Sequence, residues 1–240
     1  MVLRRLIRGL GYDLVRRGKS RDVHDQLVAA LHRHEVDAVL DVGANSGQYG
    51  RRLRRHGWQG PIISFEPQAD VHARLLRQAR PDRSWIVAPP MALGAEDGMA
   101  TLERSAESDM SSLLPQNPTL QKLSPSSAIV DRVEVPLRRL DGLSQLQDGR
   151  FARMLLKIDV QGSEFDVLEG AKGLLGRIAG IQLETALVPL YVGEHGFRSA
   201  LERLEDLGFD LHLLIPGYYE RKLGRQLQVD MVAFRERVPG

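Results

Sequence analysis

Residues 39–50 read VLDVGANSGQYG, an apolar run that ends on an acid and passes through two glycines into a helical pattern. In an open α/β sheet, a strand delivers a bound cofactor to the N-terminus of a helix through such a turn. Glu66 closes the next apolar run along the chain. Glycines followed by an acid at the next strand end form the arrangement that holds an adenosine and its ribose. The glycine turn and Glu66 together predict a cofactor site on a mostly parallel sheet.

The glycine loop favours a cofactor without phosphate. Gly43 and Gly47 let the backbone turn sharply and approach a ligand closely. In the dinucleotide fingerprint a middle glycine admits the pyrophosphate, but Asn45 stands at that place here. The loop therefore points to S-adenosylmethionine, and Asp41 is expected to receive its ammonium group or to shape the turn. A tight turn with no ligand is the alternative interpretation.

Glu66 and the proline after it form the second part of this site. A carboxylate accepts hydrogen bonds from both hydroxyls of a ribose, and Pro67 is expected to start the following helix. The alternative is a surface glutamate at a helix start. The glycine loop upstream favours ribose binding.

Composition limits the class of protein. The 240 residues are enough for one large domain. The net charge of +2 and an aromatic content of 5% argue against a nucleic-acid partner. The chain has no cysteine, which excludes disulfides and cysteine-bound metals. It also has neither an apolar run of transmembrane length nor a signal-peptide pattern, so a cytoplasmic protein is expected.

The apolar periodicity predicts alternating strands and helices, and hence a parallel sheet that ends in an antiparallel pair. Ser163 and Asp166 are expected to cap one helix together. Strands at 99–103 and 132–137 are expected to frame a Ser/Pro-rich segment at 104–128, which reads as a long loop. The main strands are expected at 38–42, 61–65, 85–87, 154–159, 181–184, 209–214 and 228–234, and the helices at 22–33, 48–56, 68–79, up to 171, and 197–207.

Residues 1–20 have leucines at helical spacing with arginines between them. A basic amphipathic helix of this kind either packs on its own domain or rests on an anionic membrane surface. The second interpretation makes the protein peripheral to the membrane.

Several blocks of the sequence resemble the FkbM family of methyltransferases, from about residue 36 to 235. They are DVGANSGQYG, FEP, ALG at 92–94, LLKIDVQGSEFDVLEGA at 155–171, LETALVPLYVGE and QLQVDMVAF. The resemblance implies a Rossmann-like class I α/β fold, with a seven-stranded, mostly parallel sheet, an antiparallel last strand and helices on both faces. It places the methyltransferase domain at 36–237, with 104–128 as an insertion and 1–35 as a helical extension. It also implies S-adenosylmethionine-dependent O-methylation of a small acceptor, namely a sugar, a glycolipid or a polyketide-type product.

The same resemblance assigns roles to individual residues. The methionine end of the cofactor would be wrapped by Asp41, Gly43, Asn45 and Gly47. The ribose would be held by Glu66 and Pro67, and the adenine would be lined by Met91, Ala92 and Leu93. Ser111 would lie over the cofactor or the acceptor, and Asp159 would face the transferred methyl group.

Carboxylates at predicted strand ends are the catalytic candidates. Asp159, Glu164 and Glu184 provide either a general base or oxygen ligands for a magnesium ion that activates the hydroxyl. Glu184 is followed by Thr185 rather than by a second acid, which weakens the metal interpretation. Without a metal, Asp159 or His195 is the base. Candidate acceptor-pocket side chains are Tyr191, Tyr218, Tyr219 and His212.

Two further functions stay open at this stage. A nucleic-acid methyltransferase of the same fold needs a basic face and aromatic side chains that stack on an extruded base. A non-catalytic S-adenosylmethionine-binding scaffold needs only the cofactor loop. The intact strand-end acids disfavour the scaffold.

Overall fold

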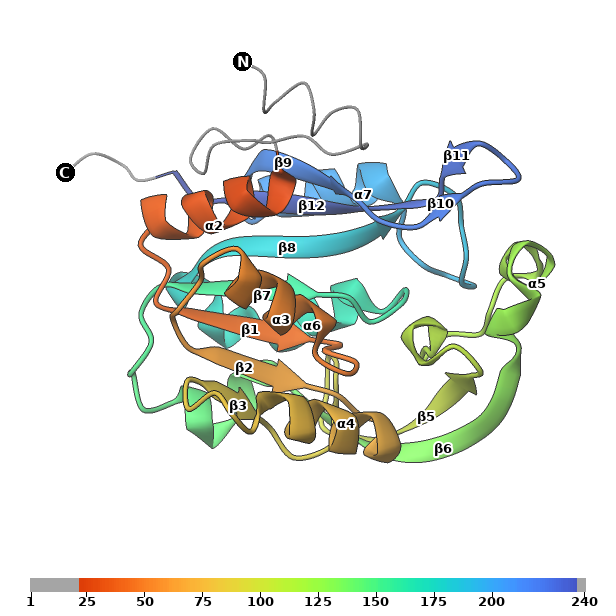
Figure 1. Cartoon of the computed structure of the whole chain (residues 1–240), viewed down its shortest axis with the longest axis horizontal. Helices are drawn as coiled ribbons and strands as arrows, with labels where there is room; N and C mark the ends of the chain where they lie inside the picture. The colour runs from red at the N-terminus through yellow and green to blue at the C-terminus, as the bar shows by residue number, and fades with distance from the viewer. Residues whose placement is uncertain (1–21, 237–240) are drawn as a thin grey trace, which may run out of the picture.

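The computed structural model describes residues 22–236, and its centre is a seven-stranded sheet (Figure 1). Neighbouring strands are parallel except that β12 runs antiparallel to both of its neighbours. This confirms the predicted mostly parallel sheet and its antiparallel last strand. In spatial order the strands are β3 (Trp85–Val87), β2 (Ile62–Phe65), β1 (Ala38–Val42), β7 (Met154–Ile158), β8 (Ile178–Ala186), β12 (Gln228–Phe234) and β9 (Asp210–Pro216).

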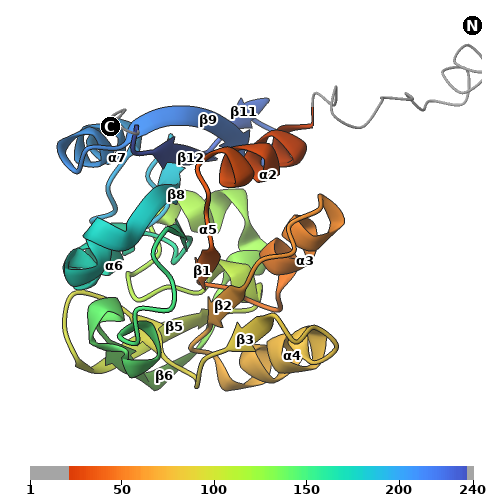
Figure 2. The ribbon, with the colours of Figure 1, turned by 90° about the vertical axis from the view of Figure 1, so that its left-hand side faces the viewer.

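Helices cover both faces of the sheet (Figure 2). One layer consists of α2 (Val23–Arg33), α3 (Gln48–Arg55) and α4 (Ala69–Ala79), whose Leu27, Leu53 and Leu75 enter one apolar core. The other layer contains α6 (Glu164–Gly170) and α7 (Phe197–Asp206), whose Leu168 and Leu204 enter the second core. Because β1 and β7 are buried along their whole length between these layers, their sequences are almost continuously apolar.

Of the N-terminal region, the structure describes only the part from residue 22 onward. The predicted basic helix at 1–20 lies outside the described residues. Within the predicted extension 1–35, helix α2 packs its Leu27 and Leu31 into the same core as Val39 of β1. This helix is therefore a layer of the domain itself.

A second sheet stands beyond the carboxyl ends of β1 and β2 (Figure 1). It has the order β4 (Ala92–Leu93), β6 (Ile129–Arg138) and β5 (Gly98–Ser105), so the two predicted framing strands are confirmed and are longer than expected. The long loop predicted at 104–128 is wrong, because that segment contains η1 (Ser108–Met110), α5 (Pro118–Leu123) and η2 (Pro125–Ser127).

The sequence does contain the signals for α5. Pro118 stands in its first turn, and the Asn117 side chain accepts a hydrogen bond from the Thr119 amide at 2.9 Å. Leu120 of this helix is fully buried in a small apolar cluster. Serines and prolines therefore mark helix ends here.

Three smaller differences from the prediction concern two helix starts and one turn. Helix α4 begins at Ala69 rather than at Pro67, and the Ser163 side chain makes no capping hydrogen bond. The turn predicted between the last two strands contains a hairpin, β10 (Tyr219–Glu220) and β11 (Arg225–Gln226). The remaining short helices are η3 (Leu140–Gly142), η4 (Ser144–Leu146) and η5 (Lys172–Arg177).

Between residues 22 and 236, no helix has the length and apolarity to cross a membrane.

Candidate active site

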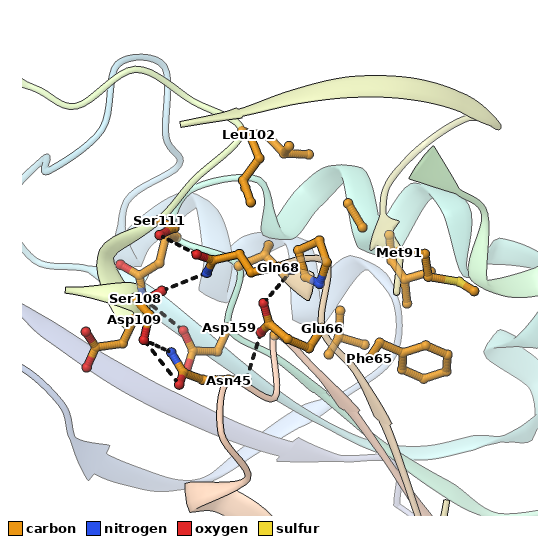
Figure 3. Close-up of a pocket in the computed structure, with 18 residues that line it drawn as sticks. Asn45, Phe65, Glu66, Gln68, Met91, Leu102, Ser108, Asp109, Ser111 and Asp159 are labelled. Carbon is orange, nitrogen blue, oxygen red and sulfur yellow. Dashed lines mark hydrogen bonds between the residues drawn. The ribbon is translucent and has the colours of Figure 1, made fainter. Parts of the chain in front are cut away.

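A pocket lies at the carboxyl ends of β1, β2 and β7, beneath β4, β5 and η1 (Figure 3). The empty space inside it, counted together with the solvent at its open mouth, is about 630 Å³. The sequence-predicted residues that line it are Gly43, Asn45, Glu66, Pro67, Met91, Ala92, Leu93, Ser111 and Asp159. Asp41, Gly47, Glu164, Glu184 and His195 are not among the lining residues.

The turn after β1 is held between two other strands. The amides of Gly43 and Ala44 donate to the carbonyl oxygen of Phe65, at 3.1 and 2.9 Å. Gly43 has φ +72°, and a Cβ atom there would lie 1.8 Å from the carbonyl oxygen of Asp159. Only glycine fits this contact. Gly47, with φ +89°, instead makes room for the ring of Trp85, away from the pocket.

Glu66 presents a buried carboxylate to the pocket. It is 3% exposed and accepts hydrogen bonds from the amides of Asn45 and Gln68, both at 2.9 Å. Burial raises its pKa to about 7, although these two hydrogen bonds act in the opposite direction. Each oxygen has capacity left to accept from a ligand hydroxyl.

Asp41 lies behind the pocket and takes the second of its two predicted roles. It is fully buried and forms an ion pair with Lys157 at 3.1 Å. Lys157 also donates to the carbonyl oxygen of Gly43 at 3.0 Å, so the pair fixes the glycine turn. Burial disfavours the charged lysine, but the carboxylates of Asp41 and Asp159 outweigh it and raise its pKa.

Asp159 enters the pocket from the end of β7. Its side chain is 34% exposed, and its Oδ2 lies 3.5 Å from the Lys157 ammonium. Its Oδ1 accepts a hydrogen bond from the side-chain nitrogen Nε2 of Gln161 at 2.9 Å, and the same nitrogen donates to Glu184 at 2.6 Å. A cation and an amide therefore orient a carboxylate that water and a ligand reach.

The two other predicted acids have different surroundings. Burial, together with the nearby charges of Asp159 and Asp230, raises the pKa of Glu184 well above its usual range. Glu164 accepts hydrogen bonds from the amides of Val160 and Gly162, at 3.2 and 2.9 Å. Burial raises the pKa of Glu164 to about 7. Glu164 thus supports the turn between β7 and α6.

The geometry does not support the predicted magnesium site. The Gln161 amide nitrogen stands between Asp159 and Glu184, and Glu164 is occupied by backbone amides. Over residues 22–236, the one group of three His or acidic residues with mutually close ligand atoms is Asp22, His24 and His56. That group lies where α2 begins and α3 ends, outside the pocket.

The histidine and tyrosine candidates are scattered. His195 is exposed and stacks on Phe165 at 3.9 Å between ring centroids. His212 packs edge-on against Phe234, whose strand partner Gly180 is near the start of β8. The structure thus places His212 at the opposite end of the sheet from the pocket.

Tyr191 supports the pocket from behind. It is 1% exposed, and its hydroxyl contacts the Met110 carbonyl at 3.1 Å and the Gln161 side-chain oxygen at 3.0 Å. It therefore joins η1 to the turn that carries Asp159. Tyr218 packs in the same apolar cluster, while Tyr219 is exposed.

Sequence reasoning missed the roof of the pocket. Leu102, Ser108, Asp109 and Leu113 line it from β5 and from the segment that follows β5. The side-chain amide nitrogen of Asn45 donates to the Ser108 hydroxyl at 3.1 Å, across 63 residues of sequence (Figure 3). No local pattern predicts this contact, because it depends on how the second sheet folds back.

The residues present fit S-adenosylmethionine. A buried carboxylate at the end of β2 suits a ribose diol, and the apolar side chains of Phe65, Met91 and Leu93 beside it suit an adenine ring. The crowded Gly43 turn brings backbone to the same wall.

Comparison with known proteins identifies the family. The family model of the methyltransferase FkbM domain matches residues 41–211. The chain is 28% identical over 192 residues to the 2-O-methyltransferase NoeI of Sinorhizobium fredii strain NGR234, covering 77% of each chain. It is 26% identical over 185 residues to Methyltransferase 1 of Beauveria bassiana, covering 71% of each.

A solved structure gives the fold. The magnesium protoporphyrin IX methyltransferase of Synechocystis PCC 6803, solved with bound S-adenosylmethionine, superposes with a TM-score of 0.50 at 12% identity. The match covers 89% of this chain and 78% of that one. The predicted Rossmann-like class I methyltransferase fold is confirmed.

Proposed function

Because the chain belongs to the FkbM family of S-adenosylmethionine-dependent methyltransferases, we propose that it methylates a hydroxyl group of a small acceptor, namely a sugar, a glycolipid or a polyketide-type product. The similarity to a protein named as a 2-O-methyltransferase supports oxygen as the methylated atom. The observation that carries the proposal is the oriented, partly exposed carboxylate of Asp159 in the pocket.

The cofactor is held by the walls of the pocket built from β1, β2 and β4. Of the lining residues, Glu66 would accept from the ribose hydroxyls, Met91 and Leu93 would contact the adenine, and the turn at Gly43 and Asn45 would receive the methionine end. When bound, S-adenosylmethionine supplies a methyl group on a positively charged sulfur.

Asp159 acts as the general base. An acceptor hydroxyl must lose a proton as its oxygen takes the methyl group, and a positioned carboxylate accepts that proton. Lys157 and Gln161 orient Asp159, while Glu184 lies outside the lining of the pocket. Positioning of the acceptor supplies the rest of the rate.

The charge of the pocket favours an acceptor without phosphate groups. Among the described residues that line it are the acids Glu66, Asp109 and Asp159, and neither lysine nor arginine. A nucleic acid or a phosphorylated sugar would meet repulsion there. This supports a neutral hydroxylated acceptor over the nucleic-acid alternative.

Two measurements on the full chain test the proposal. The first is calorimetric titration with S-adenosylhomocysteine, for which we expect micromolar binding. The second is methyl transfer to a panel of glycosides, glycolipids and polyketides, with an oligonucleotide as comparison. Turnover in EDTA should equal turnover in magnesium, because the three acids do not converge.

The variant Asp159→Asn tests the base. We expect it to bind S-adenosylhomocysteine as the parent does and to lose about 10²–10⁴-fold in kcat. Asp109→Asn at the pocket mouth is the matched control and should retain most of the turnover. Normal kcat in Asp159→Asn refutes the base assignment, and preferred methylation of the oligonucleotide refutes the acceptor class. Cofactor binding with no turnover on any substrate favours the scaffold.

A further inference from the structure

The hairpin formed by β10 and β11 carries exposed apolar and basic side chains together. Tyr219 and Leu223 are 52% and 53% exposed, and Arg221, Lys222 and Arg225 beside them are exposed as well. The neighbouring loop adds Leu187 and Val192, which are 38% and 53% exposed. We call this set of seven side chains the rim surface.

The rim surface reaches the pocket through Tyr191, which precedes Val192 and whose hydroxyl contacts the pocket-lining Gln161 at 3.0 Å. The amide of Leu187 donates to the Leu227 carbonyl, and the amide of Leu227 donates to the Tyr218 carbonyl, both at 2.8 Å, which ties the loop to the base of the hairpin. The Val192 amide donates to Pro115 at 2.8 Å, next to α5. Figure 1 shows the hairpin projecting at the same end of the molecule as α5, past the carboxyl ends of the parallel strands.

The hairpin has a net positive charge at its tip. Its acid, Glu220, is buried and accepts hydrogen bonds from the Tyr218 hydroxyl and the Lys222 amide, both at 2.8 Å. Among the described residues, Arg221, Lys222 and Arg225 form no ion pair with an acid within 4 Å. The three cations therefore face solvent.

Apolar side chains on a projecting turn, flanked by cations, match the chemistry of an anionic lipid surface. Leucine and tyrosine side chains enter the boundary between headgroups and acyl chains, and each lysine or arginine near the surface is attracted to anionic headgroups. A nucleic acid would use the cations but would gain nothing from Leu223 or Val192. We propose that the rim surface docks the protein on an anionic membrane surface, with the pocket mouth beside the bilayer.

This inference stands on the rim surface alone and does not depend on which hydroxyl is methylated. The test is co-sedimentation of the full chain with vesicles of phosphatidylcholine, with and without phosphatidylglycerol. We expect binding to the anionic vesicles that weakens in high salt, because surface charges are screened. The variant carrying Arg221→Glu, Lys222→Glu and Arg225→Glu should bind at least about tenfold more weakly.

A second basic face supplies the control. Arg51 and Arg55 on α3 and Arg77 on α4 are exposed, so their replacement by Glu makes the same charge change elsewhere. We expect this control to bind vesicles like the parent protein, and Leu223→Ser to weaken binding with no change of charge. Equal binding by the hairpin variant, loss of binding in the control, or binding of an oligonucleotide in preference to vesicles overturns the proposal. Thermal unfolding and S-adenosylhomocysteine titration of each variant show that fold and pocket are intact.

Discussion

The two walls of the pocket are built in different ways. On the cofactor side, each contact sits at the end of a strand of the central sheet, and the Gly43 turn, Glu66 and Asp159 are linked by backbone hydrogen bonds and by Lys157. On the other side, the segments around α5, Tyr191 and the β10–β11 hairpin stand behind the lining of the pocket and share a small apolar cluster of their own. We expect this side, called the acceptor wall below, to face the acceptor. One wall is fixed by the core of the domain, and the other is held together locally.

The difference indicates how much a substitution in each wall should change the free energy of unfolding of the whole domain. Damage to the cofactor wall reaches the main core, because its charged pair and its glycine turn lie within the sheet. Damage to the acceptor wall is confined to a cluster that has few apolar residues to lose. The following predictions test this division, from the largest expected effect to the smallest.

Removing the buried cation should cost the most stability. Lys157→Met leaves the buried Asp41 carboxylate with the Ser64 hydroxyl but without a cation, which is expected to lower the free energy of unfolding by about 3–5 kcal/mol. Urea denaturation measures the loss. The double variant Asp41→Asn with Lys157→Met should recover most of it, because neither buried charge remains. A single variant as stable as the parent would contradict the placement of this wall in the core.

Glu66→Gln should weaken the cofactor wall without unfolding it. Loss of the carboxylate is expected to cost about tenfold or more in S-adenosylhomocysteine affinity at pH 8, since a charged hydrogen-bond acceptor is removed. Burial raises the pKa of Glu66 to about 7. If the ionised form binds the ligand, the affinity of the parent should rise with pH up to about 7 and then level off.

The same group gives a stability signature of opposite sign. The folded protein keeps the Glu66 proton up to about pH 7, whereas the unfolded chain loses it near the usual pKa of 4.5. This group therefore favours folding at pH 4.5 and loses that contribution as pH rises to 7. In Glu66→Gln, both pH dependences should be reduced. Calorimetry and urea midpoints between pH 5 and 8 measure them, and unchanged profiles would show that Glu66 does not titrate there.

Tyr191→Phe should have the smallest effect. It removes the single hydroxyl donor that the Met110 carbonyl and the Gln161 side-chain oxygen share, a loss of about 1 kcal/mol in total. We expect a changed KM for the acceptor and an unchanged affinity for S-adenosylhomocysteine. Tyr49→Phe is the control, because it removes another buried hydroxyl bond, to Gln182 at 2.7 Å, away from the acceptor wall. Equal effects of both variants on the acceptor KM would contradict the division of the walls.

The same division explains what the sequence could predict. The central sheet and the residues Gly43, Asn45, Glu66 and Asp159 were predictable, because an apolar run followed by a glycine or an acid marks a strand end locally. Ser108 and Asp109 were not, since they reach the pocket only through the second sheet. Asp41 takes the second of its two predicted roles, that of shaping the turn, and Gly47 makes room for Trp85. Both serve the turn and its packing and are not exposed to the pocket.

The hydrogen bond between Asn45 and Ser108 has a consequence for the order of events at the site. Ser108 belongs to the segment that continues into α5, so the roof over the cofactor loop and the wall of the acceptor are one stretch of chain. A ligand that orders this stretch from either side leaves less ordering for the second ligand to accomplish. Because binding linkage is reciprocal, we expect cofactor and acceptor to tighten the binding of each other by the same factor.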